Sequence, residues 1–68
     1  MLYKTNNGYT LEIKEALIVH SGPEIFFNTR KGARIFFKEI WHLEQFLLTK
    51  AQFLGYVKII SGPKMTWG

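Results

Sequence analysis

The chain has 68 residues, and a chain this short buries only roughly 60% of the surface that it exposes when unfolded. It contains no cysteine, which excludes a disulfide framework and a thiolate metal site. Its hydrophobic content of 47% and aromatic content of 16% are typical of a folded domain, not of a disordered chain. We therefore expect a single small domain over residues 1–68, with a loosely ordered segment at residues 1–8.

The net charge is +4 and the pI is about 9.6. Residues 28–38 contain Arg30, Lys31, Arg34 and Lys38 and no acid, so this window alone carries as much positive charge as the whole chain. A local basic block favours a polyanionic partner. The alternative is that these residues are basic only because turns are exposed to solvent, and that they bind no anionic partner.

No apolar run approaches the ~18 residues that a membrane-spanning helix needs. The first residues also lack the basic start and apolar block of a signal peptide. We therefore expect an intracellular, cytoplasmic protein with no membrane partner.

The first third of the chain predicts strands. Asn6, Asn7 and Gly8 are turn residues, so residues 2–5 are expected to pair with the segment after this turn. Apolar and polar residues alternate over residues 9–14, which indicates a strand. The alternation weakens and then resumes at residues 17–19, so we expect a bulge or bend near Glu15. The alternative is a helix over residues 11–20, but the β-branched residues there favour a strand.

After the turn signal Ser-Gly-Pro at residues 21–23, residues 25–37 read IFFNTRKGARIFF. A type I turn over residues 29–32, with Gly32 left-handed, predicts a bulged hairpin that pairs Phe26 with Phe36. One face is then wholly apolar and consists of Ile25, Phe27, Ala33, Ile35 and Phe37. The other face interleaves aromatic, amide and basic side chains, namely Phe26, Asn28, Arg34, Phe36 and Lys38. A two-residue turn would slip the register and mix the two faces.

The period then changes to that of a helix over residues 40–54, with Gly55 in position to end it. No Ser, Thr, Asp or Asn precedes it as an N-cap. Its apolar side is wider than one small sheet can cover. We therefore expect a homodimer whose interface includes the flanks of that side, formed by Trp41, Leu48, Phe46 and Phe53.

Residues 56–61 read as a strand and residues 64–67 as a short final one. The expected fold is α+β: an antiparallel sheet of four to five strands packed on a single amphipathic helix.

Residues with catalytic chemistry are sparse. There is no Asp, the five Glu residues form no obvious pair, and His20 and His42 stand alone. Neither a nucleophile elbow nor a phosphate-binding loop occurs. We expect no enzymatic activity, no metal site and no cofactor.

Two functions remain. The first is binding of single-stranded nucleic acid by the aromatic and basic hairpin face together with Arg30 and Lys31, because bases stack on exposed rings while cations follow the phosphates. The second is a protein-interaction module, such as a homodimeric accessory or inhibitor protein that docks on a larger partner through its apolar helix and aromatic surface.

Overall fold

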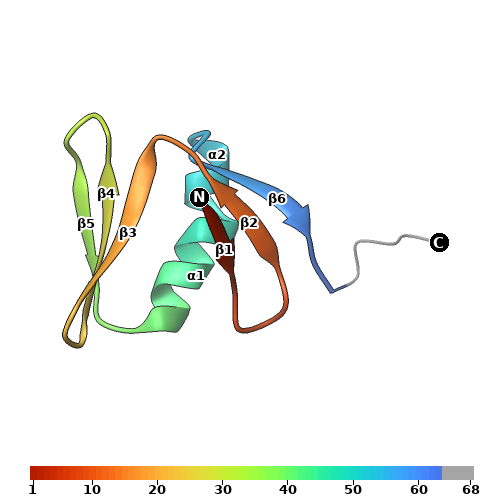
Figure 1. Ribbon diagram of the computed structural model, residues 1–68, viewed down its shortest axis with the longest axis horizontal. Helices are drawn as coiled ribbons and strands as arrows, with labels where there is room; N and C mark the ends of the chain where they lie inside the picture. Colours follow the sequence, from red (N-terminus) through yellow and green to blue (C-terminus); the bar gives the residue numbers. More distant parts are fainter. Residues whose placement is uncertain (64–68) are drawn as a thin grey trace.

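Two three-stranded antiparallel sheets and one helical segment make up the fold. It is taken from a computed structural model, which describes residues 1–63. The first sheet has the order β1 (Leu2–Lys4), β2 (Thr10–Ile13), β6 (Val57–Ser61). The second has the order β3 (Ala16–Ser21), β4 (Glu24–Thr29), β5 (Arg34–Phe37), and the helices are α1 (Ile40–Leu48) and α2 (Lys50–Phe53) (Figure 1). The α+β class is confirmed, but two sheets of three strands replace the single sheet of four to five.

The chain passes from the first sheet to the second at a sharp bend between β2 and β3. Glu15 has φ 58°, a left-handed conformation that is uncommon for a residue with a side chain. Hydrogen bonds hold the bend on both sides: the Lys14 N–H donates to the Tyr56 carbonyl and the Arg30 N–H donates to the Glu15 carbonyl, both at 2.8 Å. The bend expected near Glu15 is confirmed, and the alternative helix over residues 11–20 is wrong.

The N-terminal segment belongs to the first sheet. β1 pairs with β2 in a register that sets Tyr3 opposite Leu11, as predicted for residues 2–5. This strand occupies part of the segment, residues 1–8, for which we expected loose order.

The β4–β5 hairpin has the predicted register, with Ile25 opposite Phe37, Phe26 opposite Phe36 and Phe27 opposite Ile35. Its turn is closed at Thr29, whose N–H donates to the Ala33 carbonyl at 2.8 Å and whose hydroxyl accepts from the Ala33 N–H at 2.9 Å. Gly32 has φ 102°, which a glycine adopts without a steric penalty. The bulged turn is therefore confirmed.

The helical segment is interrupted at Thr49, so the single helix expected over residues 40–54 is wrong in this detail. The Thr49 hydroxyl donates to the Gln45 carbonyl at 2.7 Å, and such bonds to the preceding turn bend helices. Gly55, with φ 89°, ends α2. Its N–H donates to the Gln52 carbonyl, and the Tyr56 N–H donates to the Ala51 carbonyl, which is the Schellman arrangement.

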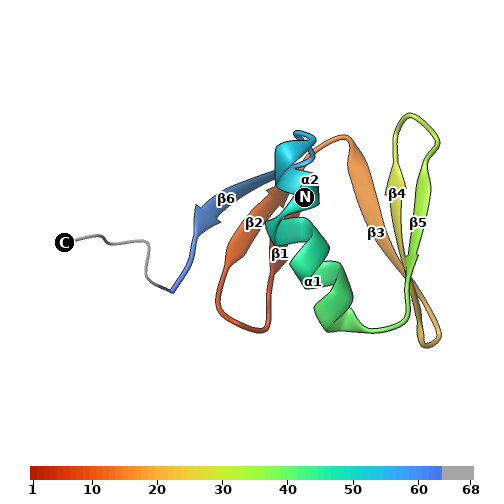
Figure 2. The ribbon, with the colours of Figure 1, turned by 180° about the vertical axis from the view of Figure 1, so that it is seen from behind.

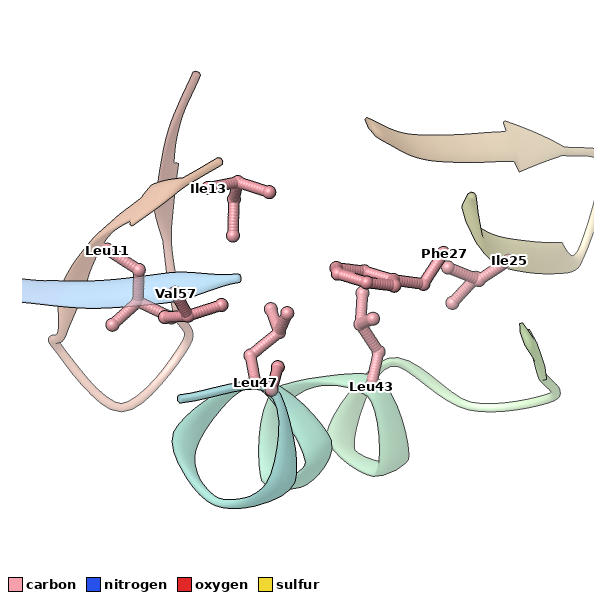
Figure 3. Close-up of a cluster of buried hydrophobic side chains, with 8 residues drawn as sticks. Leu11, Ile13, Ile25, Phe27, Leu43, Leu47 and Val57 are labelled. Atoms are coloured by element: carbon pink, nitrogen blue, oxygen red, sulfur yellow. The ribbon is translucent and has the colours of Figure 1, made fainter. Parts of the chain in front are cut away.

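The core lies where the helical segment spans the space between the two sheets (Figure 2). Figure 3 shows that Leu43 and Leu47 of α1 point into the space between the two sheets. Both are fully buried. The other buried apolar side chains come from β2, β6, β4 and α2, and are Leu11, Ile13, Val57, Ile25, Phe27 and Ala51. Burial of these residues from both sheets against one helix holds the sheets together.

β6 confirms the strand expected over residues 56–61, whereas the strand expected over residues 64–67 lies outside the described residues. Within residues 1–63, neither helix is long and apolar enough to cross a membrane.

Candidate functional site

The second sheet has one face packed on the core and one face turned away from α1, which we call the outer face. Strand pairing sets Val19, Phe26 and Phe36 side by side across it, and Leu17, Asn28 and Arg34 in the next row. Because side chains alternate along a strand, Phe27 between Phe26 and Asn28 is fully buried. The predicted segregation of the two hairpin faces is therefore present along β4 and β5, whereas Ala33, which was predicted for the apolar face, is exposed at the turn.

A guanidinium and two aromatic rings form the centre of the outer face. The Arg34 guanidinium carbon lies 4.0 Å from the centre of the Phe26 ring, within the range of a cation–π interaction. The Phe26 and Phe36 ring centres lie 5.4 Å apart with the planes tilted by 42°. Phe26 is half-buried, whereas Phe36 is 45% exposed. The arrangement offers a free aromatic surface next to a delocalised cation.

A shallow hollow of about 320 Å³ lies at the end of the outer face next to the β3–β4 turn. Phe36 and Lys38 line it together with Pro23 and Glu24. The Phe36 ring suits a planar apolar group, and the Lys38 ammonium suits an anion beside that group. The Glu24 carboxylate partly offsets the charge of Lys38.

Asn28 lies on the central strand of the sheet with its amide oxygen Oδ1 buried and, among the described residues, without a hydrogen-bond partner. Leaving a buried acceptor unpaired costs about 1–3 kcal/mol. Unsatisfied polar groups of this kind occur at functional sites, where stability is lost to keep a polar group in place.

Arg30 and Lys31 lie at the hairpin tip, where Arg30 lines a hollow of about 440 Å³ with Leu17 and Asn28 of the outer face. Arg30 Nε lies 3.4 Å from Glu15 Oε2, and both cations line a hollow with the α2–β6 turn. The outer face and its end therefore bring together five of the seven predicted residues, namely Phe26, Asn28, Arg34, Phe36 and Lys38, while the remaining two lie at the hairpin tip.

Two outer-face residues, Leu17 and Val19, were missed in the sequence analysis. They are 60% and 37% exposed. The feature of the sequence that indicates their position is the Ser-Gly-Pro turn. Ser21 pairs with Glu24, so the hairpin connection consists of two residues, Gly22 and Pro23. Gly22 has φ 61°. Counting back from that turn sets Val19 opposite Phe26.

The four residues assigned to an oligomer interface do not share one surface. Trp41, 55% exposed, and Leu48 line a groove of about 530 Å³ beside the β1–β2 turn. Phe46 packs inside the single chain, with its ring centre 5.2 Å from that of Phe27. Phe53 is 89% exposed at the end of α2.

Glu44 of α1 joins the helix to the first sheet and was also missed. Glu44 is only 7% exposed, and its carboxylate accepts hydrogen bonds from the Tyr3 hydroxyl and the Asn6 N–H, each at 3.1 Å. Burial raises the pKa of Tyr3 to about 12, and the Glu44 charge and hydrogen bond add to the effect. The feature of the sequence that indicates burial of Glu44 is its place on the helix. Ile40, Leu47 and Leu48 lie three or four positions away from it and therefore on the same side.

Within residues 1–63, no three His, Cys, Asp or Glu side chains lie close enough to hold a metal ion. Comparison with protein-family models, with curated proteins and with solved structures gave no significant match.

Proposed function

We propose that the protein binds single-stranded nucleic acid on the outer face and is not an enzyme. The observation that carries this proposal is the cluster at its centre, where the Arg34 guanidinium lies 4.0 Å over the Phe26 ring and the exposed Phe36 ring lies 5.4 Å beyond. Unpaired bases stack on aromatic rings and on guanidinium planes. Each such stack contributes about 1–3 kcal/mol.

A single strand suits this surface better than a duplex. The outer face is a side of a three-stranded sheet, and its aromatic rings need the flat faces of unstacked bases. Reading a duplex requires an element that enters the major groove. The polar residues of α1 include neither Arg nor Lys, so the helix lacks the residues that most often contact guanine there.

The phosphates would be held by Arg34 and Lys38, with Glu24 as the nearby acid. For a single strand, the slope of log affinity against log salt concentration becomes more negative by about 0.7 for each phosphate that the protein neutralises. Two contacts on the outer face therefore correspond to a slope of about −1 to −2. Participation of Arg30 and Lys31 would steepen it to about −2 to −3.

The test is fluorescence anisotropy of a labelled single-stranded oligonucleotide, titrated with the full chain at several salt concentrations. Expected are saturable binding with a slope of about −1 to −3 and weaker binding to a duplex of the same sequence. Absence of binding at low salt, where a basic protein has every electrostatic advantage, would contradict the proposal.

The second candidate function is docking on another protein, favoured by the exposure of Leu17 and Val19 beside the aromatic cluster. Aliphatic side chains contribute nothing to stacking on bases, but they extend an apolar patch of the kind that covers a protein partner. On this reading Arg34 orients the partner and does not hold a phosphate.

We also propose that two copies associate through the groove that contains Trp41 and Leu48. Light scattering at increasing protein concentration should give the mass of a dimer, and the chain with Trp41→Ser and Leu48→Ser should give that of a monomer. The same change at Phe53, which lies outside the groove, is the control and should leave the mass unaltered. A wild-type chain that is monomeric throughout would rule out the dimer.

A further inference from the structure

Three connecting segments meet at one end of the molecule, where Figure 1 shows the β4–β5 tip, the β2–β3 bend and α2 on the same side. Backbone hydrogen bonds link them through the bend, from Arg30 to Glu15 and from Lys14 to Tyr56. We call this surface the basic end; it consists of Lys14, Glu15, Arg30, Lys31, Phe53 and Leu54.

The basic end exposes two consecutive apolar side chains. Phe53 is 89% exposed, the highest value among the large hydrophobic residues within residues 1–63, and Leu54 is 52% exposed. The Schellman turn at Gly55 fixes the backbone beneath them. Their exposure is therefore built into an ordered turn, and neither side chain contributes much to the core.

Three cations belong to the same end of the molecule as these apolar residues. Lys14, Arg30 and Lys31 are exposed, and the one carboxylate, Glu15, is paired with Arg30. Arg30 and Lys31 line a hollow of about 340 Å³ together with Leu54, Gly55 and Tyr56. An anionic group with an apolar neighbour is the chemistry that this surface complements.

We propose that the basic end docks on an anionic lipid surface, with Phe53 and Leu54 inserted at the headgroup boundary and Lys14, Arg30 and Lys31 at the level of the lipid phosphates. Peripheral membrane binding combines buried apolar area with attraction to anionic lipids. A protruding Phe needs no matching pocket in a bilayer. A second copy of the chain fits poorly here, because two basic ends would repel each other.

This inference does not rest on the proposed function, which is carried by the aromatic cluster of the outer face; Arg30 and Lys31 are the two residues that both proposals use. It also differs from the expectation that the protein has no membrane partner. That expectation followed from the missing spanning segment, which a peripheral contact does not require.

The test is co-sedimentation of the full chain with vesicles of phosphatidylcholine alone and of phosphatidylcholine mixed with phosphatidylserine. Binding is expected only to the mixed vesicles and should weaken as salt is added. A cation near an anionic bilayer is worth about fivefold in affinity, so Lys31→Glu should weaken binding by about 25-fold. Phe53→Ser should weaken it by about tenfold or more.

Matched controls place the same changes far from the basic end. Ile60→Ser removes an exposed apolar side chain from β6, and Lys38→Glu reverses a charge at the opposite end of β5; both should bind vesicles as the wild type does. Lys38→Glu should nevertheless weaken oligonucleotide binding, which keeps the two proposals distinguishable. Three results would overturn the inference: the wild type fails to sediment with mixed vesicles at low salt, Phe53→Ser binds these vesicles normally, or Lys31→Glu and Lys38→Glu lose equal affinity for the vesicles.

Discussion

The Tyr3 hydroxyl on β1 donates a hydrogen bond to the Glu44 carboxylate on α1, at 3.1 Å and across 41 positions of the chain. The same carboxylate accepts from the Asn6 N–H in the adjoining turn. One buried acid thus fixes both the edge strand of the first sheet and the turn that leads out of it. Because a charged acceptor strengthens these bonds, the link has measurable consequences for stability.

Stability should fall at high pH through Tyr3. Its pKa is raised from 10.0 to about 12 in the folded chain, so the folded state favours the neutral phenol. The contribution is fully present below pH 10 and is lost as the pH rises toward 12. Urea unfolding across this range should show the loss in the wild type, and Tyr3→Phe should reduce it. An identical alkaline loss in both chains would contradict the assignment.

Removing the Glu44 carboxylate should destabilise the chain chiefly through lost hydrogen bonds. Glu44→Ala leaves the Tyr3 hydroxyl and the Asn6 N–H without their acceptor, and we expect a loss of about 2–3 kcal/mol in unfolding free energy. Gln45→Ala, at the exposed neighbouring position, should cost less than about 0.5 kcal/mol. Equal losses in the two urea titrations would show that Glu44 makes no special link.

The sequence was informative wherever a local rule acted alone. Alternation together with turn chemistry gave the register of Phe26 opposite Phe36, because a one-residue slip would have exposed the apolar face. Gly32 and Gly55 both marked backbone positions with positive φ. The five outer-face residues followed from that register.

The arrangement of segments that are far apart in the chain was harder to predict from the sequence. Alternation shows which residues share a face, but not which sheet a strand joins, so the bend at Glu15 gave no indication that it begins a second sheet. The second sheet covers helix surface that one sheet would have left open. Phe46 therefore packs against Phe27, although the sequence assigned it to an oligomer interface. The pairing of Arg30 with Glu15 was likewise not predicted, because it depends on the bend.

The two faces of the β4–β5 hairpin should separate stability from binding. Phe27→Ala opens a cavity in the core and should cost about 3–5 kcal/mol, enough to unfold much of so small a domain. Phe36→Ala removes a ring that is 45% exposed and should cost about 1 kcal/mol or less, while weakening oligonucleotide binding about tenfold or more. Urea titrations and anisotropy on the same samples measure both effects. Normal oligonucleotide binding by a folded Phe36→Ala chain would count against the outer face.

Asn28 should show a conflict between stability and function. Asn28→Val removes a buried acceptor that has no partner among the described residues and adds a β-branched residue to a central strand. We expect unfolding free energy to rise by about 1 kcal/mol and oligonucleotide affinity to fall. A less stable Asn28→Val chain would mean that the amide makes a stabilising contact in solution.

The central claim is most directly tested by two charge reversals on opposite sheets. Arg34→Glu lies in the aromatic cluster of the outer face, and Lys58→Glu lies at an exposed position on β6; each lowers the net charge by the same amount. If the outer face binds a single strand, anisotropy at fixed salt should show a loss of affinity for Arg34→Glu that exceeds the loss for Lys58→Glu by about tenfold or more. Equal losses would mean that total charge alone attracts the oligonucleotide and would contradict a binding site on this face.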